Sequence, residues 1–290
     1  VSLGLAGTAP GVVLDTGSCV VVVLPGPPGE LRRLWPKALE TPALRGVLAR
    51  AAPPKRDVLR LYGVSESAVA RALAEAGGDG DGIEVTICAR DFEIHVDVLS
   101  ETAAARRSEQ LTKRLRQSVE EYLFAADERG VEEIVLDLCR SRRFTLGVAE
   151  SCTGGLVAAR LTSVPGSSDV FRGGVVAYAN PVKTEQLGVP EAMLDAHGAV
   201  SAEVAKAMAQ GARKRLRVDV AVSVTGVAGP GGGTPERPVG LVCFHASGPD
   251  GELAHAFDLP GDREWIRTRS AAAALHLVRT LLTQSRHEVG

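Results

Sequence analysis

Ser151 and Cys152 stand side by side in the stretch AESCTGGLVAARL, residues 149–161, and either side chain has the chemistry of a nucleophile. The run FTLGVAE that leads into them has the apolar pattern of a buried strand, and LVAARL after them has the pattern of a helix. The sequence therefore predicts a strand-to-helix turn that carries both candidates.

The same turn predicts a site for a negatively charged group. N–H groups at a helix start have no partner within the helix, and the positive end of the helix dipole favours a phosphate, a carboxylate or a developing oxyanion. Thr153, Gly154 and Gly155 would line such a site, because glycine lets a ligand approach the backbone closely. The alternative is that Thr153 only caps the helix and that the glycines only shape the turn.

A lysine at the start of a second predicted helix is the candidate base. The run YANPVK follows the strand-like GGVVAY, so Asn180 is predicted as the N-cap and Pro181 as the first helical residue. Lys183 then lies in the first turn, where the helix dipole disfavours its charged form and lowers its pKa. Such a lysine can take a proton, and Tyr178 can relay or orient it. An exposed lysine beside a packed tyrosine is the alternative.

Two further stretches predict ligand contacts. TGVAGPGGGT, residues 225–234, follows the strand-like VAVSV, and its glycines suit a loop that wraps a ligand near Thr225 and Gly226. It matches neither phosphate-binding glycine motif, because it lacks G-K-[ST] and leads into a strand, so a structural loop is the alternative. Asp262 predicts a cap for the last helix, and Arg263 beside it has the fork geometry that binds a phosphate.

The elements that must position these residues alternate in the manner of a layered α/β domain. The predicted helices are 131–142, one from 154, 181–187, 201–216 and 262–284. The predicted strands are 144–149, 174–179, 218–225, 239–247 and 252–258.

The first 126 residues predict a different organisation. Residues 57–126 form a small α+β unit, with Ser65 capping one helix, one alternating strand over 83–99, and a second helix whose apolar face carries Leu111, Leu115 and Val119. Residues 1–50 contain one clear strand and one clear helix, too few for a sheet, and indicate the tail of a larger domain. The run AAPP at 51–54 marks a joint between the two parts.

Composition limits the class of protein. The 290 residues are 45% hydrophobic and 23% charged, which is typical of a folded globular chain. A net charge of -2 gives no general reason to bind nucleic acid or a membrane surface. The five cysteines form no C-x-x-C pair, and the six histidines form no metal-binding spacing. We therefore expect a cytoplasmic protein that needs no metal.

Together these stretches resemble one family. ESCTGGL, PGSS, YANPVK, LGV, HGAVS, TGVAGPGGG, RPVG and GDR occur here in the order seen in the CinA family of competence/damage-inducible proteins, whose C-terminal domain is the PncC-type nicotinamide mononucleotide amidase. GTAPG and PGPPGEL resemble the end of the family's molybdopterin-binding-like domain. The implied domains are a remnant of that domain at 1–52, a KH-like linker at 53–128 and a three-layer α/β/α amidase domain at 129–290. The rest of the first domain, linked to ADP-ribose pyrophosphatase activity, is expected to be missing.

The resemblance also implies roles. It makes Ser151 the nucleophile, Lys183 the general base, Tyr178 an assisting residue and Arg263 the phosphate ligand. The implied reaction deamidates nicotinamide mononucleotide to nicotinic acid mononucleotide and ammonia in pyridine nucleotide salvage, without a cofactor. The expected substrate-binding residues are Thr153, Gly154, Gly155, Asn180, Thr225, Gly226 and Arg263. The expected assembly is a homodimer.

Two alternatives and two departures accompany the resemblance. Cys152 as a thiolate with His197 is an alternative nucleophile and base. A second alternative is a competence- or damage-associated interaction or nucleotide-binding protein without amidase activity. Gly77-Gly78-Asp79-Gly80 has the spacing of a KH loop, but aspartate there repels phosphates and no lysine or arginine adjoins it in sequence, so nucleic-acid binding is not expected. Arg237 stands where related sequences carry lysine, which changes any point contact.

Overall fold

The computed structural model describes residues 1–7, 9–51 and 53–284. Thr8 of GTAPG and Ala52 of the predicted joint lie outside the described residues. The chain divides into two compact units. The first comprises residues 1–56, 79–85 and 98–112, and the second comprises residues 57–78, 86–97 and the chain from 113 onward.

A five-stranded sheet organises the C-terminal half of the chain. Its strands are β8 (Leu146–Glu150), β9 (Phe171–Val176), β10 (Val220–Gly226), β11 (Leu241–Gly248) and β12 (Gly251–Asp258). They lie in the order β12-β11-β10-β8-β9. β8 pairs in parallel with β9 and β10, whereas β11 is antiparallel to β10 and to β12. The carboxyl ends of β8, β9 and β10 therefore lie at one edge of the sheet.

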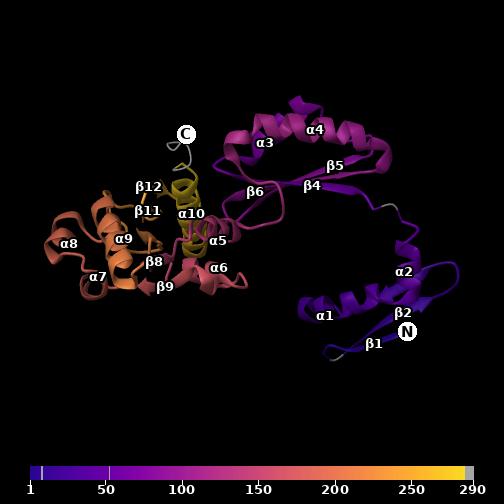
Figure 1. The fold of residues 1–290 in the computed structure, drawn as a ribbon, viewed down its shortest axis with the longest axis horizontal. Coiled ribbons are helices and arrows are strands. Elements are labelled where there is room, and N and C mark those ends of the chain that lie inside the picture. The colour runs from indigo at the N-terminus through magenta and orange to yellow at the C-terminus, as the bar shows by residue number, and fades with distance from the viewer. Residues whose placement is uncertain (8, 52, 285–290) are drawn as a thin grey trace. The chain divides into compact units, whose positions relative to one another are not determined.

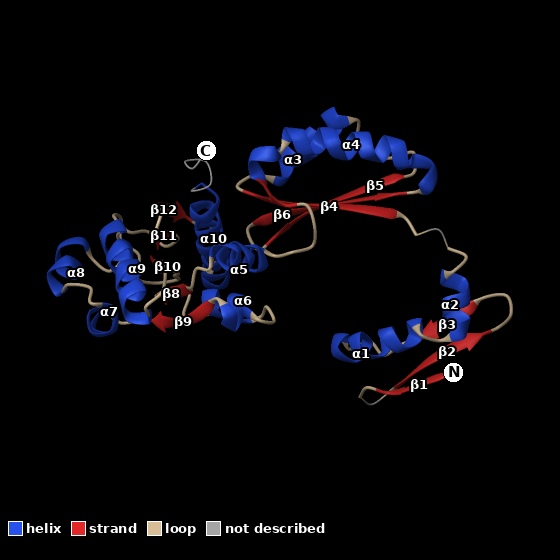
Figure 2. Ribbon diagram, viewed as in Figure 1, coloured by secondary structure: helices blue, strands red, loops and turns tan. Residues whose placement is uncertain are grey.

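Helices cover both faces of this sheet, as Figures 1 and 2 show. On one face lie α5 (Val131–Arg142), α6 (Leu156–Thr162) and α10 (Arg263–Gln284), and on the other lie α7 (Asn180–Leu187), α8 (Glu191–His197) and α9 (Ala202–Leu216). The predicted three-layer α/β/α domain is confirmed. No helix in the described part of the chain, α10 included, is both long and apolar enough to cross a membrane.

The strands form because their side chains alternate between two apolar cores. Val148 and Val222 point into the core under α5 and α10, whereas their neighbours Ala149 and Ala221 point into the core under α9. With both faces covered, β8 and β10 consist almost wholly of buried residues. Because both faces of β8 are buried, the packing fixes where β8 ends and where the turn of Ser151 begins.

The KH-like segment contains a four-stranded sheet in the order β5-β6-β4-β7. Its elements are β4 (Lys55–Tyr62), α3 (Glu66–Ala76), β5 (Ile83–Arg90), β6 (Glu93–Ser100), α4 (Ala105–Ser118) and β7 (Leu123–Ala125). The predicted cap is present, because the Ser65 hydroxyl accepts a hydrogen bond from the amide of Ala68. The single strand predicted over 83–99 is wrong. Asp91 and Phe92 have φ angles of 51° and 72°, a turn that splits the run into two strands.

The N-terminal segment forms a sheet of its own, which the sequence did not predict. Strands β1 (Ser2–Leu5), β2 (Pro10–Asp15) and β3 (Val20–Val23) pair antiparallel in that order. Helices α1 (Pro28–Leu39) and α2 (Pro42–Leu48) complete a small core around Leu3, Val13 and Leu34. The prediction of too few elements for a sheet was wrong because β1 and β2 are short, glycine-containing strands with a weak pattern.

Candidate active site

Lys183 and Ser151 meet inside the C-terminal domain. The Nζ atom of Lys183 lies 3.2 Å from the Oγ atom of Ser151. The lysine is 1% exposed and the serine 8% exposed. Nζ also donates hydrogen bonds to the backbone carbonyls of Ala177, at 2.9 Å, and Tyr178, at 3.2 Å. Every hydrogen-bond partner of this amine among the described residues is therefore an oxygen without a full charge.

Burial lowers the pKa of Lys183 below its ordinary value. The side chain forms no ion pair with a carboxylate in the described part of the chain, and the nearby Cys152 thiol offsets only part of the effect of burial on the pKa. The pKa of Lys183 is therefore lowered, as the sequence predicts, and the cause is burial.

The sheet and α7 position these two groups. Beyond the end of β8, the amide of Ser151 donates to the carbonyl of Val224 at 2.9 Å, which ties the serine to β10. Lys183 sits in the first turn of α7 and reaches back to the end of β9. The predicted cap is wrong by one position: Ala179 precedes the helix, and Asn180 and Pro181 are its first two residues. Asn180 is exposed.

Glu150 occupies the helix start that was predicted to bind an anion. Its carboxylate accepts hydrogen bonds from the amides of Gly155, at 2.9 Å, Val157, at 3.1 Å, and Ala158, at 2.9 Å. The side chain is 1% exposed, so it forms a built-in anion at the start of α6. The residue before α6 is Gly155, so Thr153 is not the cap either.

The amide of Gly154 is also taken, because it donates to the carbonyl of Ser151 at 3.1 Å. The expectation that the amides of Gly154 and Gly155 serve a substrate oxyanion is therefore wrong. The sequence signal that could have shown this is an acidic residue at the very end of a buried strand, where a lone carboxylate needs donors.

Arg267 is a site residue that the sequence analysis missed. Its Nε donates to the carbonyl of Cys152 at 3.1 Å, and its Nη2 donates to the carbonyl of Thr153 at 2.9 Å. Arg267 lies one helical turn after Arg263 on α10, which places both on one face of that helix. That spacing is the signal that could have found it.

Tyr178 and Arg263 form a second contact. Nη2 of Arg263 donates to the Tyr178 hydroxyl at 2.8 Å, and Nη1 donates to the carbonyl of Gly229 at 2.8 Å. Tyr178 is 59% exposed. No hydrogen bond recorded among the described residues joins its hydroxyl to Ser151 or Lys183, so the predicted proton relay through the phenol is not present in this geometry. Arg263 instead links the tyrosine to the glycine-rich loop.

Thr225 and Gly226 have structural contacts. The hydroxyl of Thr225 donates to the carbonyl of Ala199 at 2.6 Å, and the residue is 1% exposed. A methyl group on Gly226 would lie 2.7 Å from a side-chain carbon of Val242 and 2.9 Å from the carbonyl oxygen of Leu241. This glycine is needed for close pairing of β10 with β11, and its predicted contact with substrate has no support in the packing.

The cysteine alternative has little support. Cys152 is 4% exposed, and burial raises the pKa of its thiol to about 12, which disfavours the thiolate. His197, at the end of α8, has its imidazole Nδ1 3.8 Å from a carboxylate oxygen of Glu203.

Arg237 binds the carbonyl of His197 through Nη2 at 2.6 Å. The arginine therefore joins the glycine-rich loop to the end of α8.

The KH-like loop has an arginine beside it in space, although none adjoins it in sequence. Arg107 donates to the backbone carbonyls of Gly80, at 2.6 Å, and Asp79, at 3.3 Å. These bonds hold the loop through its carbonyls. They leave the acidic character of the loop unchanged.

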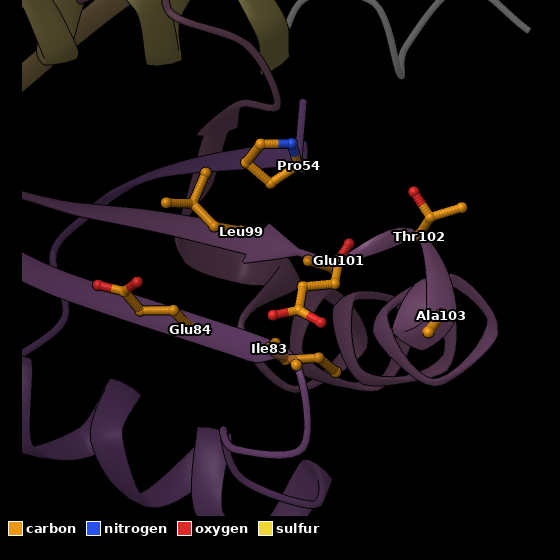
Figure 3. A pocket seen from close by; sticks show the side chains of 9 residues that line it. Pro54, Ile83, Glu84, Leu99, Glu101, Thr102 and Ala103 are labelled. Carbon is orange, nitrogen blue, oxygen red and sulfur yellow. The ribbon is translucent and has the colours of Figure 1, made fainter. Parts of the chain in front are cut away.

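A pocket of about 710 Å³ lies in the first unit (Figure 3). It is lined by Pro54, Gly82, Ile83, Glu84, Leu99, Ser100, Glu101, Thr102 and Ala103. None of these is a predicted site residue, and the carboxylates of Glu84 and Glu101 make it unsuited to a phosphate. Among residues 1–7, 9–51 and 53–284, no three histidine, cysteine or carboxylate side chains are grouped to hold a metal ion.

Two family models match the chain. The CinA C-terminal domain matches residues 128–282, and the damage-inducible protein CinA KH domain matches residues 56–126. Among solved structures, the competence/damage-inducible protein from Agrobacterium tumefaciens is 38% identical, with a TM-score of 0.51, over 56% of this chain and all of that one. A CinA superfamily protein from Klebsiella pneumoniae is 28% identical, with a TM-score of 0.50, over 54% of this chain and 99% of that one.

Curated relatives match over almost the whole chain. A CinA-like protein from Mycolicibacterium paratuberculosis is 49% identical over 287 residues, and one from Mycobacterium tuberculosis is 44% identical over 281 residues. Each match covers 96% of this chain but 65% of the relative. The chain thus spans just under two thirds of the length of these relatives.

Proposed function

The chain belongs to the CinA family, and we propose that it is an amidohydrolase that converts nicotinamide mononucleotide to nicotinic acid mononucleotide and ammonia in pyridine nucleotide salvage. The observation that carries the proposal is the buried contact of 3.2 Å between Lys183 Nζ and Ser151 Oγ. A hydroxyl beside an amine of lowered pKa has the two parts that acyl transfer needs, a nucleophile and its base.

The hydrogen bonds around Lys183 suit an uncharged amine. A neutral amine has two N–H groups and one lone pair. Nζ lies within hydrogen-bond distance of Ser151 Oγ and of the carbonyls of Ala177 and Tyr178. In the proposed neutral state the two carbonyls accept the two N–H groups, and Ser151 donates its hydroxyl proton to the lone pair. A charged ammonium has three N–H groups and no lone pair, so it would be unable to take that proton.

The proposed reaction has two halves. The Ser151 oxygen attacks the carboxamide carbon while its proton passes to Lys183, and the resulting tetrahedral oxyanion collapses to an acyl-enzyme. Lys183 returns the proton to the departing nitrogen, which leaves as ammonia. Water then attacks the acyl-enzyme while one of its protons passes to Lys183. The bond between the acyl carbon and Ser151 Oγ breaks, Lys183 returns the proton to Oγ, and the carboxylic acid is released.

Arg263 supports a nucleotide as the substrate. Its guanidinium is exposed and lies between the Tyr178 hydroxyl and the glycine-rich loop. Both of its recorded bonds are to neutral oxygens, so its charge is available to a phosphate. We propose that Arg263 binds the phosphate and that Tyr178 orients it.

One comparison tests the proposal. The purified chain is incubated with nicotinamide mononucleotide, nicotinamide and ADP-ribose, and released ammonia and the phosphate monoesters AMP and ribose 5-phosphate are measured. We expect ammonia from the mononucleotide with the wild-type chain and with Cys152→Ala. We expect a loss of at least about 1,000-fold with Ser151→Ala, as for other nucleophile deletions. Full activity of Ser151→Ala would overturn the serine mechanism.

A further inference from the structure

We propose that a pocket beside α10 binds a purine nucleoside monophosphate, with the base stacked against aromatic side chains and the phosphate at Arg269. The pocket has a volume of about 560 Å³, which suits a ligand of nucleotide size. All of its lining residues belong to the second unit, and Ser151 and Lys183 are not among them. The pocket is therefore distinct from the candidate active site, and its ligand does not depend on the proposed amidase function.

Aromatic side chains gather around this pocket. The chain has six phenylalanines, three tyrosines and two tryptophans, and four of these eleven side chains line it. Tyr62 belongs to β4, Phe92 to the turn before β6, Phe257 to β12 and Trp265 to α10. Rings from four separate places in the sequence thus form one wall, and such walls bind planar ring systems.

Trp265 is the most exposed of the four rings. It is 55% exposed, although tryptophan is highly buried on average. Its backbone amide donates to the carboxylate of Asp262 at 2.9 Å, so the start of α10 holds the residue in place while its ring stays accessible. An accessible indole can stack on the face of a base, and a purine offers a larger face than a pyrimidine.

Phe92 has a backbone conformation that disfavours its side chain. The φ angles of Asp91 and Phe92 are 51° and 72°, in a turn where glycine or asparagine is usual and a bulky residue is rare. The Phe92 ring lies edge-on to the rings of Tyr62, at 5.7 Å, and Phe257, at 5.8 Å. Strained residues of this kind are concentrated at ligand-binding sites. Here the strained turn places a ring between two others and completes the wall.

Arg269 supplies a positive charge at the same place. Its guanidinium carbon lies 4.8 Å from the centre of the Trp265 ring and 5.8 Å from the centre of the Phe92 ring. Nη1 donates to the carbonyl of Pro260 at 3.0 Å, and Nε is buried. Nη2 is neither bonded nor buried in the part of the chain that the structure describes. It is therefore available to a phosphate oxygen.

The charges around the pocket favour an uncharged base with one phosphate. The Arg269 guanidinium would repel a positively charged pyridinium ring, whereas a purine is neutral. Two of the acidic lining residues, Asp91 and Glu93, have ion-pair or hydrogen-bond partners within 3.8 Å. Glu66 is exposed in the first turn of α3, where it would repel the additional charges of a triphosphate.

The first test uses the Trp35→Phe variant, in which Trp265 is the only tryptophan. Trp35 lies on α1 in the first unit, so its replacement leaves the pocket unchanged. We expect AMP to quench the fluorescence of Trp265 with a Kd below about 1 mM. Ribose 5-phosphate, which has no base, should cause no quenching. No response to AMP up to about 10 mM would overturn the proposal.

Titration calorimetry then locates the ligand. Trp265→Leu should weaken AMP binding about 5- to 100-fold, the usual effect of one lost stacking contact, and Trp265→Phe should weaken it less. Arg269→Gln should weaken AMP binding about 10-fold or more, because a hydrogen bond to a charged group is lost. The same variant should bind adenosine, which has no phosphate, within about twofold of the wild type. Retained adenosine binding shows that the pocket is intact.

The matched control is Arg172→Gln. Arg172 is exposed on β9, at the opposite edge of the sheet from β12, and its replacement should change AMP affinity by less than about twofold. If Trp265→Leu and Arg269→Gln bind AMP as tightly as Arg172→Gln, the nucleotide binds elsewhere and the proposal is wrong. If Arg269→Gln weakens AMP and adenosine equally, the phosphate contact is wrong.

The two proposals fail separately. Neither titration measures ammonia release, so an inactive chain that binds AMP at Trp265 would refute only the amidase function. An active chain that does not bind AMP would refute only the nucleotide pocket.

Discussion

Lys183 Nζ lies 3.2 Å from Ser151 Oγ, and neither residue is more than 8% exposed. The pair joins the turn after β8 to the first turn of α7, two elements that approach only because β8 and β9 are neighbours in the sheet. The chemistry of the site depends on the charge of this one amine.

The pH profile should follow Lys183. Activity needs the neutral amine, and burial lowers its pKa below the ordinary 10.5, so kcat/KM should rise with pH and level off below that value. Lys183→Arg should remove the activity, because guanidinium stays charged. Measurement of ammonia release between pH 5.5 and 10 checks this. A profile that stays flat over this range would mean that the amine is not the base, and a rate that still rises without levelling off at pH 10 would mean that burial does not lower its pKa.

Tyr178→Phe should act on substrate binding more than on the chemical step. The hydroxyl contacts Arg263 and has no recorded bond to Ser151 or Lys183. We expect KM for the mononucleotide to rise about 5- to 10-fold, as for a lost bond of about 1–1.5 kcal/mol, with kcat changed less than threefold. In a double-mutant cycle with Arg263→Lys the two effects should not add. A larger effect on kcat than on KM would restore the relay role of the phenol.

Glu150→Gln should destabilise the domain. The carboxylate accepts three amide hydrogen bonds at the start of α6, and the amide side chain would present an NH2 group to donors. We expect the free energy of unfolding in urea to fall by about 1.5–3 kcal/mol. Glu185→Gln, at an exposed position on α7, is the control and should change it by less than about 0.5 kcal/mol. Equal effects of the two would show that Glu150 does not hold the turn.

The Gly226→Ala variant distinguishes a packing role of Gly226 from a contact with the substrate. The added methyl group would lie 2.7 Å from Val242, so we expect the free energy of unfolding to fall by about 1–3 kcal/mol. Gly231→Ala, with open space around it, should be close to neutral. If Gly226→Ala leaves stability unchanged and raises KM instead, the substrate contact predicted from the sequence is correct.

Acid should weaken the second unit through Glu93 and His276. Nε2 of His276 lies 2.9 Å from Oε1 of Glu93, and both are buried. Burial lowers the pKa of His276 from 6.5 to about 4. Burial alone would raise the pKa of Glu93, but hydrogen bonds with His276 and His95 lower it from 4.5 to about 2.

Both pKa values are lower in the folded chain, so the unfolded chain binds more protons. The difference lies between pH 4 and 6.5 for His276 and between pH 2 and 4.5 for Glu93. The free energy of unfolding should therefore fall as the pH drops below 6.5. His276→Gln should flatten the slope between pH 4 and 6.5, measured by urea unfolding. An unchanged slope would assign the acid sensitivity to other groups.

Much of the C-terminal domain could be predicted from its sequence. Apolar runs, glycine turns and caps are local patterns, so the α5 helix, the strand-to-helix turn of Ser151 and the cap by Asp262 were predicted near their observed positions. Where the local pattern is weak, the predictions were wrong: β1 and β2 were not predicted, and the turn at Asp91 was predicted as part of one continuous strand.

Only the tertiary structure decided the contacts of the site. Ser151 and Lys183 are 32 positions apart, and Arg267 and Cys152 are 115 apart, so no local pattern relates them. The sequence placed suitable residue types at the ends of strands. Folding decided that Lys183 is buried without a carboxylate partner among the described residues, that Glu150 takes the start of α6, and that Arg267 holds the turn. These outcomes depend on which elements become neighbours, which is set by burial of the whole sheet between two layers of helices.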